Sequence, residues 1–258
     1  MLAVKMGLYN LMDGGIDPVI GADPNGSDTR FREQMAMLAE REFDVLGLLE
    51  GKHWTDNRRQ LQRRAEAALG MTATLVESSH HGCHLVLLTR PGRVTVLEDR
   101  HEQGHPYWHA VACQRVEIDG NVVDVALAHL APASPQLRLA EAESLALLAK
   151  TEHPLILMGD FNAVPSDYEE RTGDKPRKLD RRPALALEEV GLRDVALVHG
   201  DRTPTVGHAR QGAMAYPCDR FYTNLPRKAF VGYRVATEFD HLSDHRLVVT
   251  EVELGEAA

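Results

Sequence analysis

The sequence contains few cysteines. Only three occur in 258 residues, far apart and without a CxxC pair, at Cys83, Cys113 and Cys218. An odd number at this spacing argues against a disulfide framework and against a thiolate zinc site. A chain without disulfides is typical of a reducing compartment, so we expect a cytoplasmic protein.

The sequence also lacks an excess of positive charge. It has 29 basic and 38 acidic side chains, a formal net charge of -9, and only 5% aromatic residues. No sequence-wide positive field would therefore attract nucleic acid or an anionic membrane. A nucleic-acid partner would have to be bound by a local patch.

Long apolar runs are absent as well. No run approaches the length of about eighteen residues that a membrane-spanning helix needs. The N-terminal stretch MLAVKMGLYNLMDGG has one lysine and is interrupted at Asn10 and Asp13, too soon for a signal peptide. We therefore expect a soluble protein without a membrane span. The sequence gives no sign of its oligomeric state.

The chain does have enough apolar sequence for a large core. With 43% hydrophobic residues, its length fits one large domain about as well as two small ones, and we prefer a single domain over residues 1–258. Strand patterns are the most numerous, and they predict strands at Ala3–Leu11, Asp44–Leu49, Thr72–Val76, Leu85–Thr89, Val94–Glu98, Trp108–Ile118, Val122–Ala128, Leu155–Met158, Arg220–Thr223, Ala229–Val235 and Arg246–Val252.

Helical periodicity follows a capping residue, turn residue or proline in several places. It predicts helices at Thr29–Glu42, Asp56–Leu69, Pro135–Thr151 and Pro183–Val190. The segment EIDGNVV, around Gly120, places Asp-Gly-Asn between two apolar runs and predicts a hairpin. Many strands with scattered helices indicate packed sheets with helices outside, rather than a strictly alternating parallel fold.

Several predicted strands end in a polar side chain that can do chemistry. The apolar run LILM is followed at once by GDFN, which contains Asp160 and Asn162. Similar side chains stand at or near other strand ends: Asn10, Glu50, His129, Asp219, Asp244 and His245. Each alone has a simpler explanation as a solvated turn residue, a structural histidine or an Asx turn. Their recurrence favours a shared site.

The types of these residues indicate the chemistry. Carboxylate and amide oxygens, as on Glu50 and Asn10, suit magnesium, whereas clustered cysteines or an HExxH pair, typical of zinc, are lacking. Asp160 and Asn162, two residues apart in one turn, could address one reaction centre. One would accept a proton from water and the other would fix its orientation.

At these positions the sequence resembles the metal-dependent endonuclease/exonuclease/phosphatase superfamily. That superfamily includes deoxyribonuclease I, the exonuclease III class of abasic-site endonucleases, and inositol and sphingolipid phosphodiesterases. The matching segments follow in the superfamily's order over nearly the whole chain: Asn10–Gly15, DVLGLLE ending at Glu50, Gly82–Arg90, Ala128–Leu130, Gly159–Ala163, Asp219–Tyr222 and Ser243–His245. The ordered set is much more specific than GDFN or SDH alone.

The resemblance implies an α/β fold, a four-layer α/β sandwich with two face-to-face, mainly antiparallel β-sheets flanked by helices. It also implies magnesium as cofactor, with manganese as a substitute. Glu50 corresponds to the principal metal ligand, with Asn10 next to it and Asp244 as a metal-side or structural acid. One departure is Pro217, which stands where the superfamily usually has a basic residue two positions before Asp219.

The resemblance further implies the catalytic roles. Asp160 corresponds to the residue that aligns or deprotonates the attacking water, and Asn162 to the amide that holds phosphate or metal. His245 corresponds to the histidine that contacts phosphate, and Asp219 to its orienting carboxylate. His129 corresponds to a second histidine near the leaving group.

The substrate contacts are less defined. Arg171–Arg182 carries six basic and two acidic residues directly after the catalytic turn, so Arg177 and Lys178 could belong to a phosphate-binding flap, or the segment could be a solvated loop. Trp54 follows Glu50 closely and could stand at the cleft mouth or simply cover core. Arg220 could partly substitute for the basic residue that Pro217 replaces. His101–His109 could form an aromatic wall for a base or an ordinary hairpin.

Two classes of function follow. The first is a phosphodiester or phosphomonoester hydrolase, using in-line attack of an activated water, for a small or lipid-like molecule. The second is a DNA or RNA nuclease of the same superfamily. The acidic balance and low aromatic content favour the first. A non-enzymatic binding module with this fold is disfavoured, because the set Asn10, Glu50, Asp160, Asn162 and His245 is complete.

Overall fold

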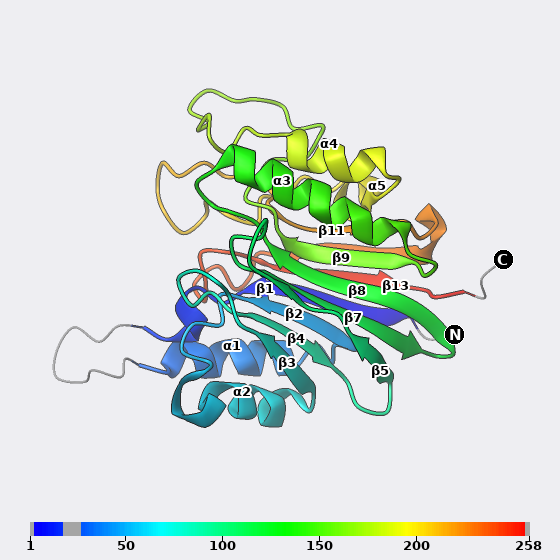
Figure 1. Cartoon of the computed structure of the whole chain (residues 1–258). Coiled ribbons are helices and arrows are strands. Elements are labelled where there is room, and N and C mark those ends of the chain that lie inside the picture. Colours follow the sequence, from blue (N-terminus) through cyan, green and yellow to red (C-terminus); the bar gives the residue numbers. More distant parts are fainter. Residues whose placement is uncertain (1–2, 18–26, 256–258) are drawn as a thin grey trace.

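Two β-sheets form the centre of the molecule (Figure 1). The computed structural model describes residues 3–17 and 27–255. The first sheet has the order β12-β13-β1-β2-β4-β3, with β12 Phe230–Ala236, β13 Leu247–Val252, β1 Val4–Asn10, β2 Val45–Leu49, β4 Leu85–Thr89 and β3 Thr72–Val76. The second has the order β10-β11-β9-β8-β7-β5, with β10 Arg193–Asp194, β11 Asp219–Thr223, β9 Leu155–Asp160, β8 Asn121–His129, β7 Ala110–Ile118 and β5 Val94–Asp99; β6 Glu102–Gln103 also pairs with β7.

Most of the described strand pairs are antiparallel, but β1 with β2 and β8 with β9 are parallel. The helices α1 Thr29–Ala39 and α2 Asp56–Leu69 cover the outer face of the first sheet, and α3 Pro135–Ala146 and α4 Arg182–Glu189 cover that of the second (Figure 1). The short elements are α5 Val195–His199, η1 Asp13–Gly15, η2 Leu147–Lys150 and η3 Arg227–Ala229. The molecule is thus an α/β sandwich of two mainly antiparallel sheets flanked by helices, as expected.

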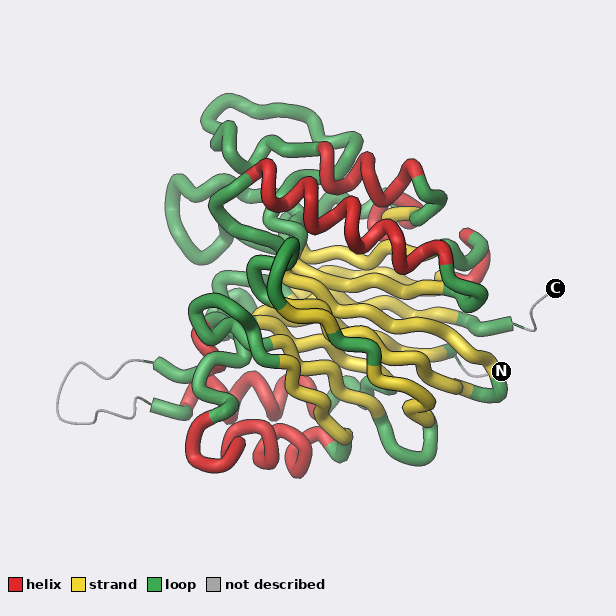
Figure 2. Tube along the Cα trace, viewed as in Figure 1, coloured by secondary structure: helices red, strands yellow, loops and turns green. Residues whose placement is uncertain are grey.

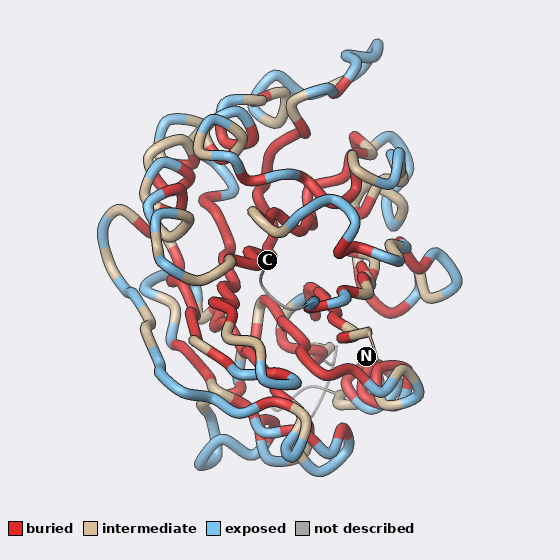
Figure 3. Tube along the Cα trace, turned by 90° about the vertical axis from the view of Figure 1, so that its right-hand side faces the viewer, coloured by how far each residue is buried: buried red, intermediate tan, exposed pale blue. Residues whose placement is uncertain are grey.

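Three apolar layers hold the sandwich together. Leu127 and Met158 lie in the layer between the two sheets. Phe31 of α1 packs in the layer between the first sheet and its helices, and Leu145 of α3 packs in the layer between the second sheet and its helices. Figure 3 shows the buried residues inside and the exposed ones on the outer loops and helix faces. The central strands β2, β4 and β9 are buried on both faces, which explains why they appear in the sequence as continuous apolar runs.

Local sequence signals set the element ends. Ser134 caps α3 by accepting the N–H of Leu137 at 3.2 Å, and Pro135 follows at the first helical position. The hairpin predicted around Gly120 joins β7 to β8 through Asp119 and Gly120, which both have positive φ.

All the predicted strands and helices are present, with some ends shifted. The largest shift is in the predicted helix Pro135–Thr151, whose α-helical part ends at Ala146 before η2. The sequence did not predict the short elements β6, β10 and α5. No helix within residues 3–17 and 27–255 is long and apolar enough to cross a membrane.

Candidate active site

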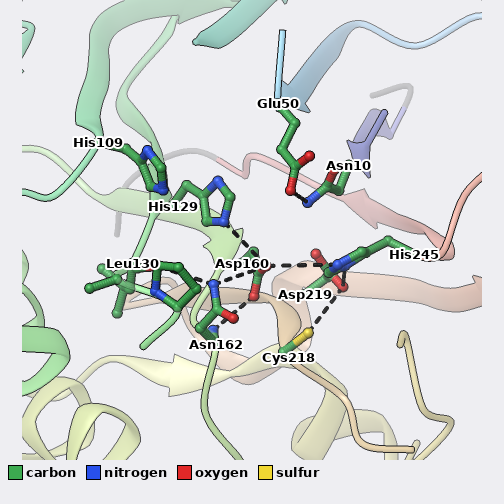
Figure 4. Close-up of polar contacts among 12 residues, drawn as sticks. Asn10, Glu50, His109, His129, Leu130, Asp160, Asn162, Cys218, Asp219 and His245 are labelled. Carbon is green, nitrogen blue, oxygen red and sulfur yellow. Dashed lines mark hydrogen bonds and ion pairs between the residues drawn. The ribbon is translucent and has the colours of Figure 1, made fainter. Parts of the chain in front are cut away.

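The strand register brings the polar strand ends to one end of the sandwich. In the first sheet the parallel pair β1–β2 places Asn10 beside Leu49, so Glu50 comes next. In the second sheet Asp160 pairs with both His129 and Asp219. Figure 2 shows that long loops gather at this same end of the sheets. Two groups of side chains from different sheets therefore face one region (Figure 4).

Close packing of β8 and β9 fixes the position of Asp160. A Cβ atom added to Gly159 would lie 2.2 Å from the carbonyl oxygen of Ala128, so a larger residue would force the two strands apart. The absence of a side chain at position 159 therefore lets the two strands carry His129 and Asp160 side by side.

The carboxylate of Glu50 accepts hydrogen bonds from two donors. Its Oε1 accepts the Asn10 Nδ2 at 3.1 Å, and its Oε2 accepts the backbone N–H of Asp13 at 3.2 Å. Glu50 has a φ of 55°, a strained conformation that non-glycine residues keep mainly where the surroundings impose it, often at functional sites. The carboxylate is only partly buried, so it remains accessible to a ligand.

Asp244 adds a second carboxylate near Glu50. Burial raises the pKa of Asp244, and the like charge of Glu50 raises it further. Lys52 pairs with Asp13 instead, and within the described part of the chain no lysine or arginine forms an ion pair with Glu50 or Asp244. The Glu50 and Asp244 carboxylates and the Asn10 amide are hard oxygen groups of the kind that magnesium prefers, and the charge of His245 partly offsets that of Asp244.

Asp160 is the centre of the second group. Its Oδ1 accepts the backbone N–H of Asn162 at 2.8 Å, while its Oδ2 lies 3.5 Å from His129 Nε2 and 4.0 Å from His245 Nε2. Burial alone would raise the pKa of Asp160, but His245, His129 and Lys178 outweigh it and hold that pKa below its usual value. Asp160 is therefore an ionised carboxylate between two imidazoles.

Asn162 is locked against Asp160. Its Nδ2 donates to the Leu130 carbonyl at 3.0 Å and to Asp160 Oδ2 at 3.3 Å, and its Oδ1 accepts the Lys178 ammonium at 2.5 Å. Asn162 has a φ of 49°, which asparagine tolerates better than most residues. Its amide oxygen and nitrogen are thus both oriented by the protein.

The expected hydrogen bond between Asp219 and His245 is present, with His245 Nδ1 2.8 Å from Asp219 Oδ2. Burial would lower the pKa of His245, but the charge and hydrogen bond of Asp219 outweigh it and hold that pKa well above its usual value. Ser243 connects this pair to the first sheet, because its Oγ donates to the Asn10 carbonyl and accepts the His245 N–H. His245 is therefore a fixed cation whose Nε2 faces Asp160.

Cys218 lies beside this pair and completes a possible metal-ligand cluster. Ligand atoms of Asp160, Cys218, Asp219 and His245 all lie within 4.8 Å of one another. Burial, followed by the charges of Asp160 and Asp219, raises the pKa of Cys218 well above its usual value, so its sulfur carries a proton. A protonated thiol is a poor metal ligand, and the Glu50 set suits a hard divalent ion better.

The basic segment meets the site at Lys178. Its Nζ donates to Asn162 Oδ1 at 2.5 Å and to the Pro132 carbonyl at 3.1 Å. Arg177 is exposed, and its backbone carbonyl accepts a hydrogen bond from Arg138. Lys178 therefore contacts the candidate site, and the segment is not a solvated loop at this position. A substrate contact by Arg177 stays a prediction.

Two predicted substrate contacts are wrong. The Trp54 side chain is 0% exposed, packs against Phe31 and donates its indole N–H to the Gly14 carbonyl at 3.1 Å, so it covers core and cannot stand at the cleft mouth. Arg220 is also 0% exposed and forms a 2.7 Å ion pair with Asp194. It points to the face of β11 opposite Asp219, since successive side chains alternate along a strand.

The segment His101–His109 is mostly exposed or partly buried, but its last residue, His109, is buried next to the site. His109 stacks on His129 with ring centroids 4.4 Å apart, and burial, with the nearby His129, lowers the pKa of His109 to about 2. Trp108 stacks on His80 at 3.7 Å. The sequence predicted an aromatic wall or an ordinary hairpin for this segment. No sequence pattern predicted that His109 would stack on His129.

The α/β sandwich gathers carboxylates, amides and imidazoles from both sheets at one end, which is the arrangement that the resemblance to a phosphoesterase superfamily implied. A model of the Endonuclease/Exonuclease/phosphatase family matches residues 9–245, and the chain belongs to this family. It is accordingly a hydrolytic phosphoesterase. No curated protein matches the sequence.

Solved structures share the fold at low sequence identity. An endonuclease/exonuclease/phosphatase from Bacteroides vulgatus has a TM-score of 0.74 at 14% identity, covering 99% of this chain and 100% of that one. The Bacteroides thetaiotaomicron mannosyl-6-phosphatase has a TM-score of 0.69 at 15% identity, covering 97% and 100%. TDP2 from D. rerio, complexed with single strand DNA product, has a TM-score of 0.69 at 17% identity, covering 97% and 99%.

Proposed function

We propose that the chain is a magnesium-dependent phosphoesterase that hydrolyses a phosphodiester or phosphomonoester of a small or lipid-like molecule. The observation that carries this proposal is the meeting of Glu50 and Asn10 from the first sheet with Asp160 from the second, at one end of the sandwich. The first pair provides hard oxygen and amide groups, and Asp160 provides a base. The acidic balance of the chain supports a small substrate over a polymer.

The residues of the site have different roles in the proposed reaction. Magnesium held by Glu50, with Asn10 and Asp244 beside it and manganese as a substitute, supplies positive charge to the phosphate oxygens when bound. Asp160 accepts the proton of the attacking water at Oδ2, the oxygen that faces both imidazoles. Asn162 holds Asp160 in place through its backbone N–H and its amide.

The two histidines act on either side of Asp160. His245, kept protonated by Asp219, donates from Nε2 to a phosphate oxygen as charge develops there. His129, braced by His109, lies at the leaving-group side with its Nε2 toward Asp160. Rigid strand ends hold these groups in one arrangement, which allows in-line attack without reorganisation.

Glu50→Gln tests this proposal. The change removes a negative charge from the oxygen set, so kcat/KM for bis-p-nitrophenyl phosphate should fall at least about a hundredfold and Mn²⁺ binding, followed by electron paramagnetic resonance, should weaken. Glu33→Gln on α1, where Glu33 is exposed, is the matched control and should behave as wild type. Wild-type rate and metal affinity in Glu50→Gln would contradict the assignment.

The second candidate is a nuclease of the same family. Four exposed cations, two of which line a hollow with His245, could contact a phosphate backbone: Arg171, Lys175, Arg177 and Arg210. Assays on single-stranded and abasic DNA beside nucleotides and inositol phosphates decide between the two. Faster hydrolysis of the DNA substrates, with a steep dependence on salt, would favour the nuclease.

A further inference from the structure

A hollow opens at the candidate site itself, where Asn162, Asp244 and His245 form part of its lining. We call it the Lys175–Arg210 pocket; it has a volume of about 290 Å³ and is lined by Lys175, Lys178, Arg210, Met214, Tyr216 and His245, among others. This volume is at the lower end of the roughly 300–1,000 Å³ of small-molecule sites. The pocket therefore suits a compact group.

Two cations of this pocket, Lys175 and Arg210, form no ion pair within the described residues. Lys178 forms none within 4.0 Å either, but its charge acts on Asp160. Several other arginines in this part of the chain are paired: Arg181 with Glu170, Arg182 with Asp180, Arg202 with Asp167 and Arg246 with Asp240. Asp244 also lines the pocket. His245 is paired with Asp219, and Lys178 acts on Asp160, so the positive charge that remains is that of Lys175 and Arg210 against Asp244. The pocket has an excess of positive charge in a chain whose net charge is -9.

A neighbouring hollow of similar size shows the contrast. It has a volume of about 260 Å³ and is lined by Arg171 and Arg202, but also by Asp167 and Glu169. There the charges balance within the protein. The unbalanced charge of the Lys175–Arg210 pocket is thus a local property and does not extend over the whole rim.

The walls of the pocket are fixed relative to the catalytic residues. Val206 forms β-bridges with both Tyr216 and His245. A Cβ atom on Gly207, whose φ is +90°, would lie 2.3 Å from the Met214 carbonyl oxygen, so the loop packs closely there. Lys178 is held by Asn162 and Pro132. A ligand in the pocket would therefore be held at a set position relative to His245.

We propose that the Lys175–Arg210 pocket binds a second phosphate group of a compact substrate, whose scissile phosphate lies against Asp160 and His245. This inference rests on the proposed function and narrows it to substrates with two phosphates on one small scaffold. Lys175 and Arg210 bind the second phosphate by charge-assisted hydrogen bonds, and Met214 and Tyr216 provide an apolar floor for the scaffold. A long nucleic acid would instead need a track of cations along the surface.

The test uses inhibition of bis-p-nitrophenyl phosphate hydrolysis by myo-inositol 1-phosphate and myo-inositol 1,4-bisphosphate. For the wild type we expect the bisphosphate to inhibit at least about tenfold more strongly than the monophosphate, since it gains charge-assisted contacts. In Lys175→Gln/Arg210→Gln this preference should fall close to one. Arg171→Gln/Arg202→Gln loses the same charge in the neighbouring hollow and should keep the preference.

Equal inhibition of the wild type by the two compounds, or an equal loss of preference in both double variants, would overturn the proposal. Calorimetric binding of the bisphosphate to the same proteins needs no turnover, so it separates failure of the pocket from failure of the proposed hydrolysis. Tighter competition by oligo-dT than by the bisphosphate, weakened equally in both double variants, would assign the cations to a nucleic-acid path and also overturn the proposal.

Discussion

At the scale of single residues, the site depends on how each polar atom is oriented. Asp219 uses Oδ2 to hold His245, while its Oδ1 is buried without a hydrogen-bond partner among the described residues. An unpaired buried oxygen costs free energy, roughly 1–3 kcal/mol, which selection retains most readily at a functional position. The pair Asp219–His245 is therefore better explained by catalysis than by stability.

Asp219→Asn should separate these two roles. The amide keeps the shape of the side chain but removes the charge that keeps His245 protonated, so kcat should fall by about 10²–10⁴. Because His245 then loses its proton, a neutral hydrogen bond replaces the buried ion pair, and the unfolding midpoint in urea should change little. Full kcat in Asp219→Asn would show that His245 works without its carboxylate.

At the scale of elements, the sequence predicted the strand ends well because apolar runs and the polar residues after them are both local signals. It also contained the information that Arg220 points away from Asp219, since alternation along β11 separates the two faces. The direction of Trp54 was not predictable in this way, because it follows from the turn after Glu50. Lys178 reaches Asn162 through a long loop, and its contact depends on tertiary packing that no local pattern encodes.

The helix α3 connects to two loops of the site through one buried carboxylate. Glu141 accepts the backbone N–H groups of Trp108 at 2.6 Å and Ala131 at 2.8 Å, close to His109 and His129. Burial raises the pKa of Glu141 to about 7, although both hydrogen bonds oppose this. The folded protein therefore keeps a proton on Glu141 at pH values where the unfolded chain has lost it.

This shift predicts a pH dependence of stability. The contribution of Glu141 to the free energy of unfolding should be fully present below about pH 4.5. It should fall by up to about 3 kcal/mol as the pH rises to about 7, since each pKa unit corresponds to roughly 1.4 kcal/mol. Urea unfolding of wild type and Glu141→Gln at pH 5 and pH 7.5 measures it. The variant should lose this part of the slope, and an unchanged slope would contradict the prediction.

At the scale of the whole molecule, the site exists only because the two sheets meet. Asn10 and Glu50 come with the first sheet, and His129, Asp160 and Asp219 come with the second. Gly47 on β2 lies at the contact between the sheets, where an added Cβ atom would be 2.8 Å from both Leu127 Cδ1 and Met158 Sδ. The spacing of the sheets thus sets the spacing of the catalytic groups.

Gly47→Ala should therefore affect activity from a distance. Overpacking of this kind costs about 1–3 kcal/mol, and a small separation of the sheets should lower kcat as well as the melting temperature. Leu127→Val makes the facing side chain on the opposite sheet smaller. The double variant should therefore recover part of the lost kcat and part of the lost melting temperature. No recovery in the double variant would show that the loss at Gly47 comes from within β2 and not from sheet spacing.

The two ends of the described chain lie at the side of the molecule opposite the candidate active site. β1 begins and β13 ends at the edge of the sandwich opposite Asn10 and His245, and Val4 pairs directly with Val252 (Figure 1). A tether joined at either end would therefore leave the end that carries Asn10 and His245 turned toward the solution. The protein can be immobilised on a bead or a sensor surface by one end while substrates, metal ions and inhibitors reach the other without obstruction.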